Sequence, residues 1–199
     1  MSLGIGSSEA VRELVEAGIR QAIVTLQDLC GAPIEYTTPQ VVQGRPQEAE
    51  SLLPPDQATG DRLVLLDFEG GLTGRGILAL PDSSGDKLVA LLERIIGRSD
   101  TAGPQRDGLL AEVGNLLLNG LLGSIANTLN ISIVAPVPQV VAGSNVPELL
   151  RSHRTVTKNP DQEVFLAVTP LHIDQHAIHG EVILLFEATS LQRLLTPAS

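Results

Sequence analysis

Glu112 and Asn115 are the side chains whose types and spacing point most directly to chemistry. They lie in a long apolar segment that is predicted to be helical, and residues three apart on a helix point the same way. A carboxylate can pair with a lysine, and a carboxamide can hold a water molecule without adding a charge. Together, the pair can contact two points of one small target on another molecule.

The helix predicted over residues 107–129 has two different sides at about 100° per residue. One side is apolar and is expected to be buried, with Leu110, Val113, Leu117, Leu121 and Ile125. A second stripe, within roughly 60° of arc, holds small and polar residues: Gly108, Glu112, Asn115, Asn119 and Ala126. The small residues would let the surface of another protein approach Glu112 and Asn115. Asn119 is either an auxiliary site residue or a helix-packing amide.

The rest of the chain repeats one order of elements. The first half is predicted to contain a helix, an extended segment broken by a proline, a hairpin and a second helix, over residues 8–29, 34–42, 62–80 and 86–96. The second half repeats this order over residues 107–129, 131–141, 163–187 and 189–195. The polar stretches 43–60 and 142–162 are predicted to be loops.

A constant spacing of 99 positions supports this repeat: Glu13 precedes Glu112, Glu16 precedes Asn115, and Pro39 precedes Pro138. A repeated order of elements implies a pseudo-twofold α/β (α+β) protein, with two long helices packed on a largely antiparallel sheet. We expect a single domain over residues 1–199, made of repeats at about 8–97 and 107–196. The strands of the two halves would form one sheet or two sheets packed face to face.

Composition narrows the class of protein. The chain has 199 residues, of which 43% are hydrophobic and only 2% aromatic, and its formal net charge is −10. A compact core is therefore expected, whereas binding to nucleic acid or insertion into an anionic membrane is not, because a phosphate-rich partner would be repelled. Cys30 is the only cysteine, which excludes an intramolecular disulfide and favours a cytoplasmic location.

The run from Glu112 to Asn119, followed by Pro138, resembles the signature of the CheC/CheX family of chemotaxis phosphatases. That signature is Asp or Ser, three residues, Glu, two residues, Asn, 22 residues, then Pro. In this chain 22 residues separate Asn115 from Pro138. The doubled layout extends the resemblance over most of the chain, as expected of CheC and the related flagellar switch proteins.

The resemblance implies dephosphorylation of a receiver protein such as CheY. Glu112 would form a salt bridge with the active-site lysine of the receiver, and Asn115 would orient a water molecule in line with the aspartyl phosphate. Mg²⁺ would be held by the receiver, so no cofactor is expected on this chain. Positioning would supply most of the rate gain, because phosphoryl transfer needs an aligned nucleophile. Asn119 and Pro138 are possible auxiliary residues.

Two departures from the family pattern stand out. Gly108 occupies the first signature position, with Asp107 one place away. In the first half Glu13 is present, but Glu16 occupies the asparagine position. A carboxylate there would face a phosphoryl group among the acidic residues of the receiver, and repulsion would disfavour docking. We therefore predict that the Glu13/Glu16 site is degenerate, with Arg20 partly neutralising Glu16 one turn away.

The alternative function is a non-catalytic module of the same fold, either a flagellar-switch-like scaffold or a regulator that binds a CheD-like deamidase. A metal site is not predicted. His172, Asp174, His176 and His179 are close in sequence, but they fall in the second predicted hairpin and its turn. Side chains there do not converge as they do on a helix, so a polar turn is the preferred interpretation.

Overall fold

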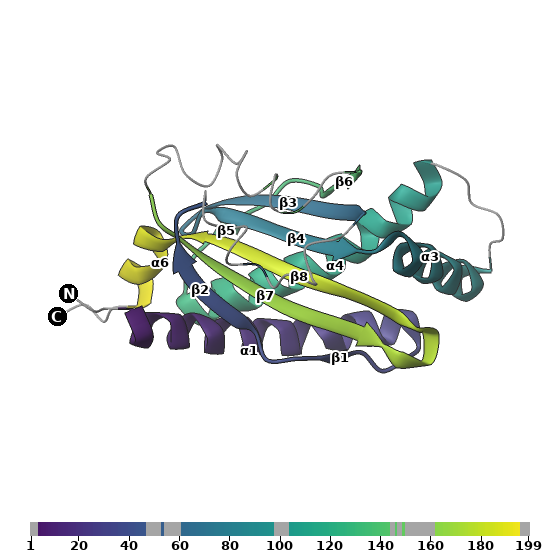
Figure 1. Ribbon diagram of the computed structural model, residues 1–199, viewed down its shortest axis with the longest axis horizontal. Coiled ribbons are helices and arrows are strands. Elements are labelled where there is room, and N and C mark those ends of the chain that lie inside the picture. Colours follow the sequence, from purple (N-terminus) through teal and green to yellow (C-terminus); the bar gives the residue numbers. More distant parts are fainter. Residues whose placement is uncertain are drawn as a thin grey trace.

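The computed structural model describes residues 4–46, 53, 61–97, 104–143, 146, 149 and 162–195, with side chains from residue 8 onward. Most of the two predicted loops, 43–60 and 142–162, lies outside these residues. Figure 1 shows one broad sheet lying against two long helices, with shorter helices at opposite ends of the sheet.

The described elements follow the predicted order. The helices are α1 (Gly4–Cys30), α3 (Asp82–Ile96), α4 (Pro104–Leu129) and α6 (Ala188–Leu195), with a 3₁₀ turn η2 (Asp174–His176). The strands are β1 (Glu35–Tyr36), β2 (Gln40–Gly44), β3 (Arg62–Gly70), β4 (Gly74–Leu80), β5 (Ile133–Val134), β6 (Gln139–Ala142), β7 (Val164–Ile173) and β8 (Ile178–Glu187).

The strands of the two halves interleave in a single sheet. Its order is β1-β7-β8-β4-β3-β5, while β2 also pairs with β7 and β6 also pairs with β3. All of these pairings are antiparallel. The first strands of each half thus pair with the hairpin of the other half, which confirms the predicted pseudo-twofold α/β (α+β) fold and selects one shared sheet over two packed sheets.

Each edge of the sheet is broken at one of the two prolines that are 99 positions apart. Pro39 separates β1 from β2, Pro138 separates β5 from β6, and both are buried. Proline has no N–H to donate to a ladder, so it is found at edge strands and strand ends. The equivalent breaks are consistent with the repeat inferred from the sequence.

The long helices α1 and α4 lie against each other on one face of the sheet. A Cβ added at Gly18 would come within 2.5 Å of Leu121 Cδ1, and one added at Gly120 would come within 3.4 Å of the Ala22 Cβ. Residues from both helices and from β3, β4, β7 and β8 form the main hydrophobic core. The other face of the sheet carries a second, smaller cluster that includes Leu63, Ile77 and Ile183.

By length and composition α4 is the one described helix that could cross a membrane. Most of its apolar residues are buried between α1 and the sheet, including all five that the helical pattern predicts to be buried: Leu110, Val113, Leu117, Leu121 and Ile125. A core helix of a globular protein passes the same test, and α4 is packed as one.

Several elements extend further than predicted. Helix α3 begins at Asp82 rather than at residue 86, because the polar run after Pro81 is held by tertiary contacts. Within this run Ser84 is buried, and its hydroxyl accepts a hydrogen bond from the His179 N–H at 3.1 Å. Strands β7 and β8 continue as far as Ile173 and Ile178, so the turn between them is only four residues long.

Candidate functional site

Close packing against the sheet fixes the orientation of α4. A Cβ added at Gly114 would lie 2.4 Å from Val64 Cγ1 of β3, so the helix lies directly on this strand at that point. Val113, Gly114, Leu117 and Leu118 are all buried. The opposite side of the same turns faces outward: Glu112 and Asn119 are exposed, and Asn115 is half-buried. Glycine at position 114 therefore determines which side chains α4 presents.

Asn115 and Asn119 are joined on this outer side of α4. The Asn119 Nδ2 donates a hydrogen bond to Asn115 Oδ1 at 2.7 Å, one helical turn away. The bond limits rotation of the Asn115 carboxamide while leaving its Nδ2 and one oxygen lone pair available to a water molecule. Asn119 thus has a contact that a helix-packing amide would not need, since it bonds to another outward-facing side chain.

Glu112 is an exposed carboxylate that has no counter-ion among the described residues. No side chain in the described part of the chain pairs with it, and two arginines, Arg106 of α4 and Arg62 of β3, are engaged elsewhere. Arg106 bonds to Asp86 at 2.7 Å, and Arg62 pairs with Asp107 at 3.5 Å. Glu112 is therefore available to a cation supplied by another molecule.

We call the surface formed by Glu112, Asn115, Leu116 and Asn119 the α4 face. Leu116 lies between the polar residues and is 36% exposed, so the face offers one apolar contact beside its polar groups. Leu116 belongs neither to the apolar side predicted from the sequence nor to the predicted stripe of small and polar residues. Only the orientation fixed by Gly114 distinguishes it from its buried neighbours Leu117 and Leu118.

The structure also shows where the remaining predicted positions, Pro138, Gly108 and Asp107, lie. Pro138 is buried at the break of the edge strand, so it can shape the edge but does not reach a partner. Gly108 is exposed, with no atom within 4 Å of an added Cβ, so no steric constraint requires glycine at that position. Asp107 beside it is tied to Arg62.

The equivalent face of α1 carries Glu13, Glu16, Arg12 and Arg20, and we call it the α1 face. Arg20 Nη2 lies 3.3 Å from Glu16 Oε1, as the i+4 spacing predicts, and Arg12 Nη1 lies 3.6 Å from Glu16 Oε2. Arg20 also donates a hydrogen bond from Nε to the Tyr36 hydroxyl at 3.5 Å. The Glu16 carboxylate is thus held between two guanidinium groups of its own helix.

The pKa values on α1 follow from these contacts. The pKa of Arg12 is raised, first by its hydrogen bond to Glu9 and then by the charges of Glu9, Glu16 and Glu13. The pKa of Arg20 is raised chiefly by Tyr36 and then by Glu16. The α1 face is therefore a self-neutralised network, unlike the α4 face.

The structure pairs His172 of β7 directly with His179 of β8 but brings together only part of the histidine-rich hairpin as possible metal ligands. His172 and Asp174 lie close to Glu35 of β1, whereas His176 and His179 belong to no such group among the described residues. The sequence analysis missed Glu35, because it is brought to the hairpin only by the pairing of β1 with β7.

Comparisons with known proteins identify the fold. No protein-family model matches the sequence, and no curated protein matches it significantly. Among solved structures, Thermotoga maritima FliY matches with a TM-score of 0.73 and 18% identity, covering 98% of this chain and 96% of that one. CheX from Desulfovibrio desulfuricans matches with a TM-score of 0.61 and 15% identity, covering 88% of this chain and 99% of that one.

The FliM middle domain from H. pylori also matches, with a TM-score of 0.63 and 12% identity, covering 97% of this chain and 98% of that one. The resemblance to CheC/CheX proteins is thus confirmed at the level of the fold. Both chemotaxis proteins and flagellar proteins have this fold, so the chemistry of this chain has to be argued from its own side chains.

Proposed function

We propose that this protein is a phospho-aspartate phosphatase, which acts on a CheY-like receiver protein through the α4 face. Support comes from one observation above all: on a fold of the CheC/CheX type, Glu112 and Asn115 lie on the outer side of α4, and Glu112 has no counter-ion in the described part of the chain. A free carboxylate and an oriented carboxamide, one turn apart, suit a lysine and a water molecule on a partner.

In the proposed reaction, Glu112 forms a salt bridge with the lysine of the receiver and so sets the register of the two proteins. The Asn115 carboxamide holds a water molecule in line with the aspartyl phosphate. The water oxygen attacks phosphorus while the bond to the aspartate oxygen breaks. Inorganic phosphate and a free aspartate carboxylate are the products, and Mg²⁺ in the receiver neutralises the charge of the transferred group.

The rigid mounting of the α4 face supports a positioning role. Asn115 is held from one side by its bond to Asn119 at 2.7 Å, and its helix is fixed on β3 at Gly114. A carboxamide held in this way loses little further freedom when it orients the water. A lysine partner also suits the acidic chain, whose net charge of −10 steers a cationic group toward it.

The test is the decay of a phosphorylated CheY-like receiver, with and without this protein, in the presence of Mg²⁺. Wild type is expected to accelerate decay, and Asn115→Ala is expected to return it to the spontaneous rate while retaining a cooperative thermal transition. If wild type leaves the decay of several receivers that bind it unchanged, the phosphatase proposal is wrong.

A second function is favoured by the α1 face and by the flagellar neighbours. FliY and the FliM middle domain share the fold, and a further neighbour is FliM in a complex with SpeE. On this alternative the chain is a non-catalytic module that binds a flagellar protein or a CheD-like protein. Binding without accelerated decay would support it.

Either function places the protein in the cytoplasm, where receivers and flagellar switch components are found. Neither requires nucleic acid, membrane insertion or a cofactor bound by this chain.

A further inference from the structure

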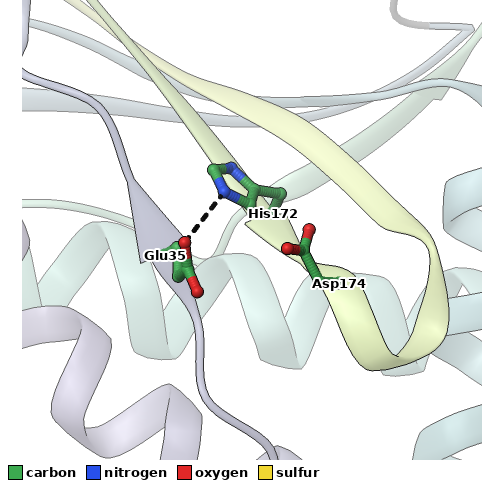
Figure 2. A group of neighbouring side chains, drawn as sticks. All are labelled: Glu35, His172 and Asp174. Atoms are coloured by element: carbon green, nitrogen blue, oxygen red, sulfur yellow. Dashed lines mark ion pairs between the residues drawn. The ribbon is translucent and has the colours of Figure 1, made fainter.

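Glu35, His172 and Asp174 bring three possible metal ligands together at one end of the sheet (Figure 2). One nitrogen or oxygen atom of each side chain lies within 4.8 Å of the others. His172 Nε2 is 3.4 Å from Glu35 Oε2. Figure 2 shows the Glu35 carboxylate facing the imidazole across the β1–β7 edge, with Asp174 at the start of the hairpin turn.

Strand register fixes this arrangement. Glu35 of β1 is the direct partner of His172 of β7, and side chains of directly opposed residues lie on the same face, about 5 Å apart at Cβ. The tight turn then places Asp174 next to the pair, since η2 begins immediately after β7. The turn is closed by the Ala177 N–H, which donates to the Asp174 carbonyl at 3.1 Å. The three groups are therefore placed by backbone pairing rather than by chance contact of long side chains.

The ligand set has the chemistry of a zinc-type site. One imidazole nitrogen with two carboxylate oxygens is a donor set that Zn²⁺ and neighbouring transition metals accept, with water at the remaining positions. The two carboxylates also attract a divalent cation electrostatically. His172 is partly shielded, with 34% of its side chain exposed, while Glu35 is 66% exposed. The site is thus open to an ion from solvent.

We propose that Glu35, His172 and Asp174 bind a divalent transition-metal ion of the zinc class, which ties the edge strand β1 to the β7–β8 hairpin. The proposal revises the expectation that this hairpin forms only a polar turn. It is independent of the proposed phosphatase activity, since the Mg²⁺ of that reaction belongs to the receiver and no step passes through this end of the sheet.

The first experiment titrates Zn²⁺ into the chelator-treated full chain by calorimetry, in a buffer that does not bind metal. Wild type is expected to bind one equivalent. His172→Ala and Glu35→Gln are each expected to weaken binding by about tenfold or more. His176→Ala is the matched control, because His176 lies in the same turn but outside the group, and its affinity is expected to stay within about twofold of wild type.

Thermal unfolding supplies a second readout. Zn²⁺ is expected to raise the melting temperature of wild type, because an ion that binds only the folded chain stabilises it, and to leave that of Glu35→Gln unchanged. Glu35→Gln keeps the size of an exposed side chain, so it remains informative if His172→Ala fails to fold. Equal Zn²⁺ affinity in wild type and Glu35→Gln, or an equal loss in His176→Ala, would overturn the proposed site.

Discussion

The same two positions on the two long helices carry Glu13 with Glu16 on α1 and Glu112 with Asn115 on α4. The first glutamate is common to both, and the second position is a carboxylate in one half and a carboxamide in the other. Glu16 lies between Arg12 and Arg20, at 3.6 and 3.3 Å, whereas Asn115 bonds to the neutral Asn119 at 2.7 Å. The comparison shows that the charged residue of the pair, Glu16, is neutralised by arginines of its own helix, whereas the neutral Asn115 is bonded to another neutral side chain.

The two faces also differ in the charged groups that they leave available to a partner protein. On α1 the Glu16 carboxylate is paired with Arg12 and Arg20, so a partner that approached Glu16 would have to break these ion pairs first. On α4 the Glu112 carboxylate has no such competitor among the described residues. Internal duplication has therefore left one open face and one self-neutralised face on a common sheet.

The largest effect is expected from Asn115→Glu, which gives α4 the residue pair of α1. A carboxylate at position 115 would repel the phosphoryl group and the acidic residues around it. Receiver dephosphorylation is expected to fall about 100-fold or more, the size of loss that follows when a reacting water is misplaced. Decay assays at saturating protein measure this. Activity within about threefold of wild type would show that the two faces do not differ for the reason given.

Glu112→Gln is expected to act mainly on affinity. The substitution keeps the shape of the side chain but removes the charge that pairs with the receiver's lysine, a change that costs about 2 kcal/mol or more for a buried interfacial pair. The KM for the phosphorylated receiver should rise about tenfold or more, and its dependence on salt should weaken. The matched change on α1, Glu13→Gln, should leave KM unaltered; an equal rise in both variants would mean that both faces bind the receiver.

Asn119→Ala is expected to have a smaller effect, confined to turnover. It removes the donor that holds the Asn115 oxygen, so the carboxamide would rotate more freely before it meets the water. We expect kcat to fall by about three- to tenfold, in keeping with a partial loss of positioning, with KM unchanged. Asn127→Ala, an exposed asparagine of the same helix, is the control. A rise in KM with kcat unchanged would assign Asn119 to docking instead.

Glu16→Asn, made in the inactive Asn115→Ala background, tests whether the α1 face needs only its missing asparagine. We expect no recovery of receiver dephosphorylation. Removing Glu16 leaves Arg12 and Arg20 without their shared partner, which adds positive charge where the receiver's lysine would have to approach. Recovery to a tenth of the wild-type rate or more would show that the identity of this residue alone distinguishes the faces.

Substitution of Glu181 is expected to have the smallest effect on the difference between the two faces, because Glu181 belongs to the sheet that both helices pack on. Glu181 is 8% exposed, one of its oxygens has no partner among the described residues, and burial raises its pKa from 4.5 to about 7. The folded chain therefore keeps this proton at pH values where the unfolded chain has lost it. Stability should fall as the pH rises from about 4.5 to about 7, by at most about 3 kcal/mol.

Melting temperatures of wild type and Glu181→Gln at pH 5 and pH 8 test this. The variant should lose the part of the pH dependence of stability that Glu181 causes, while the rate of receiver dephosphorylation stays the same. An unchanged pH dependence in Glu181→Gln would mean that Glu181 ionises normally in the folded chain.

Local patterns in the sequence were sufficient to predict the polar residues of the α4 face, but not Leu116. The helical period of Leu110, Val113 and Leu117 identified the buried side of α4, and the outward placement of Glu112 followed from it. The repeat and the two prolines predicted the order of the elements. These features depend on spacing within one segment or on a comparison of two segments, which the sequence displays directly.

Features that depend on the pairing of distant segments could not be predicted from these local patterns. The exchange of edge strands between the halves, and with it the meeting of Glu35 and His172, depends on which strand pairs with β7. The early start of α3 depends on burial of Ser84 against the β8 region. Likewise, the exposure of Leu116 depends on where Gly114 meets β3. Each of these is decided by contacts between distant segments, which local propensity does not encode.

The most direct test of the difference between the faces uses one matched pair of variants. Asn115→Ala and Glu16→Ala remove the side chain at the same position of α4 and α1, and both are measured in the same receiver decay assay. We predict that the phosphorylated receiver decays at its spontaneous rate in the presence of Asn115→Ala. With Glu16→Ala, the decay rate should stay within about twofold of that with wild type, since an exposed ion pair adds little to stability. Loss of activity in Glu16→Ala with Asn115→Ala unaffected would place the working face on α1 and contradict the account.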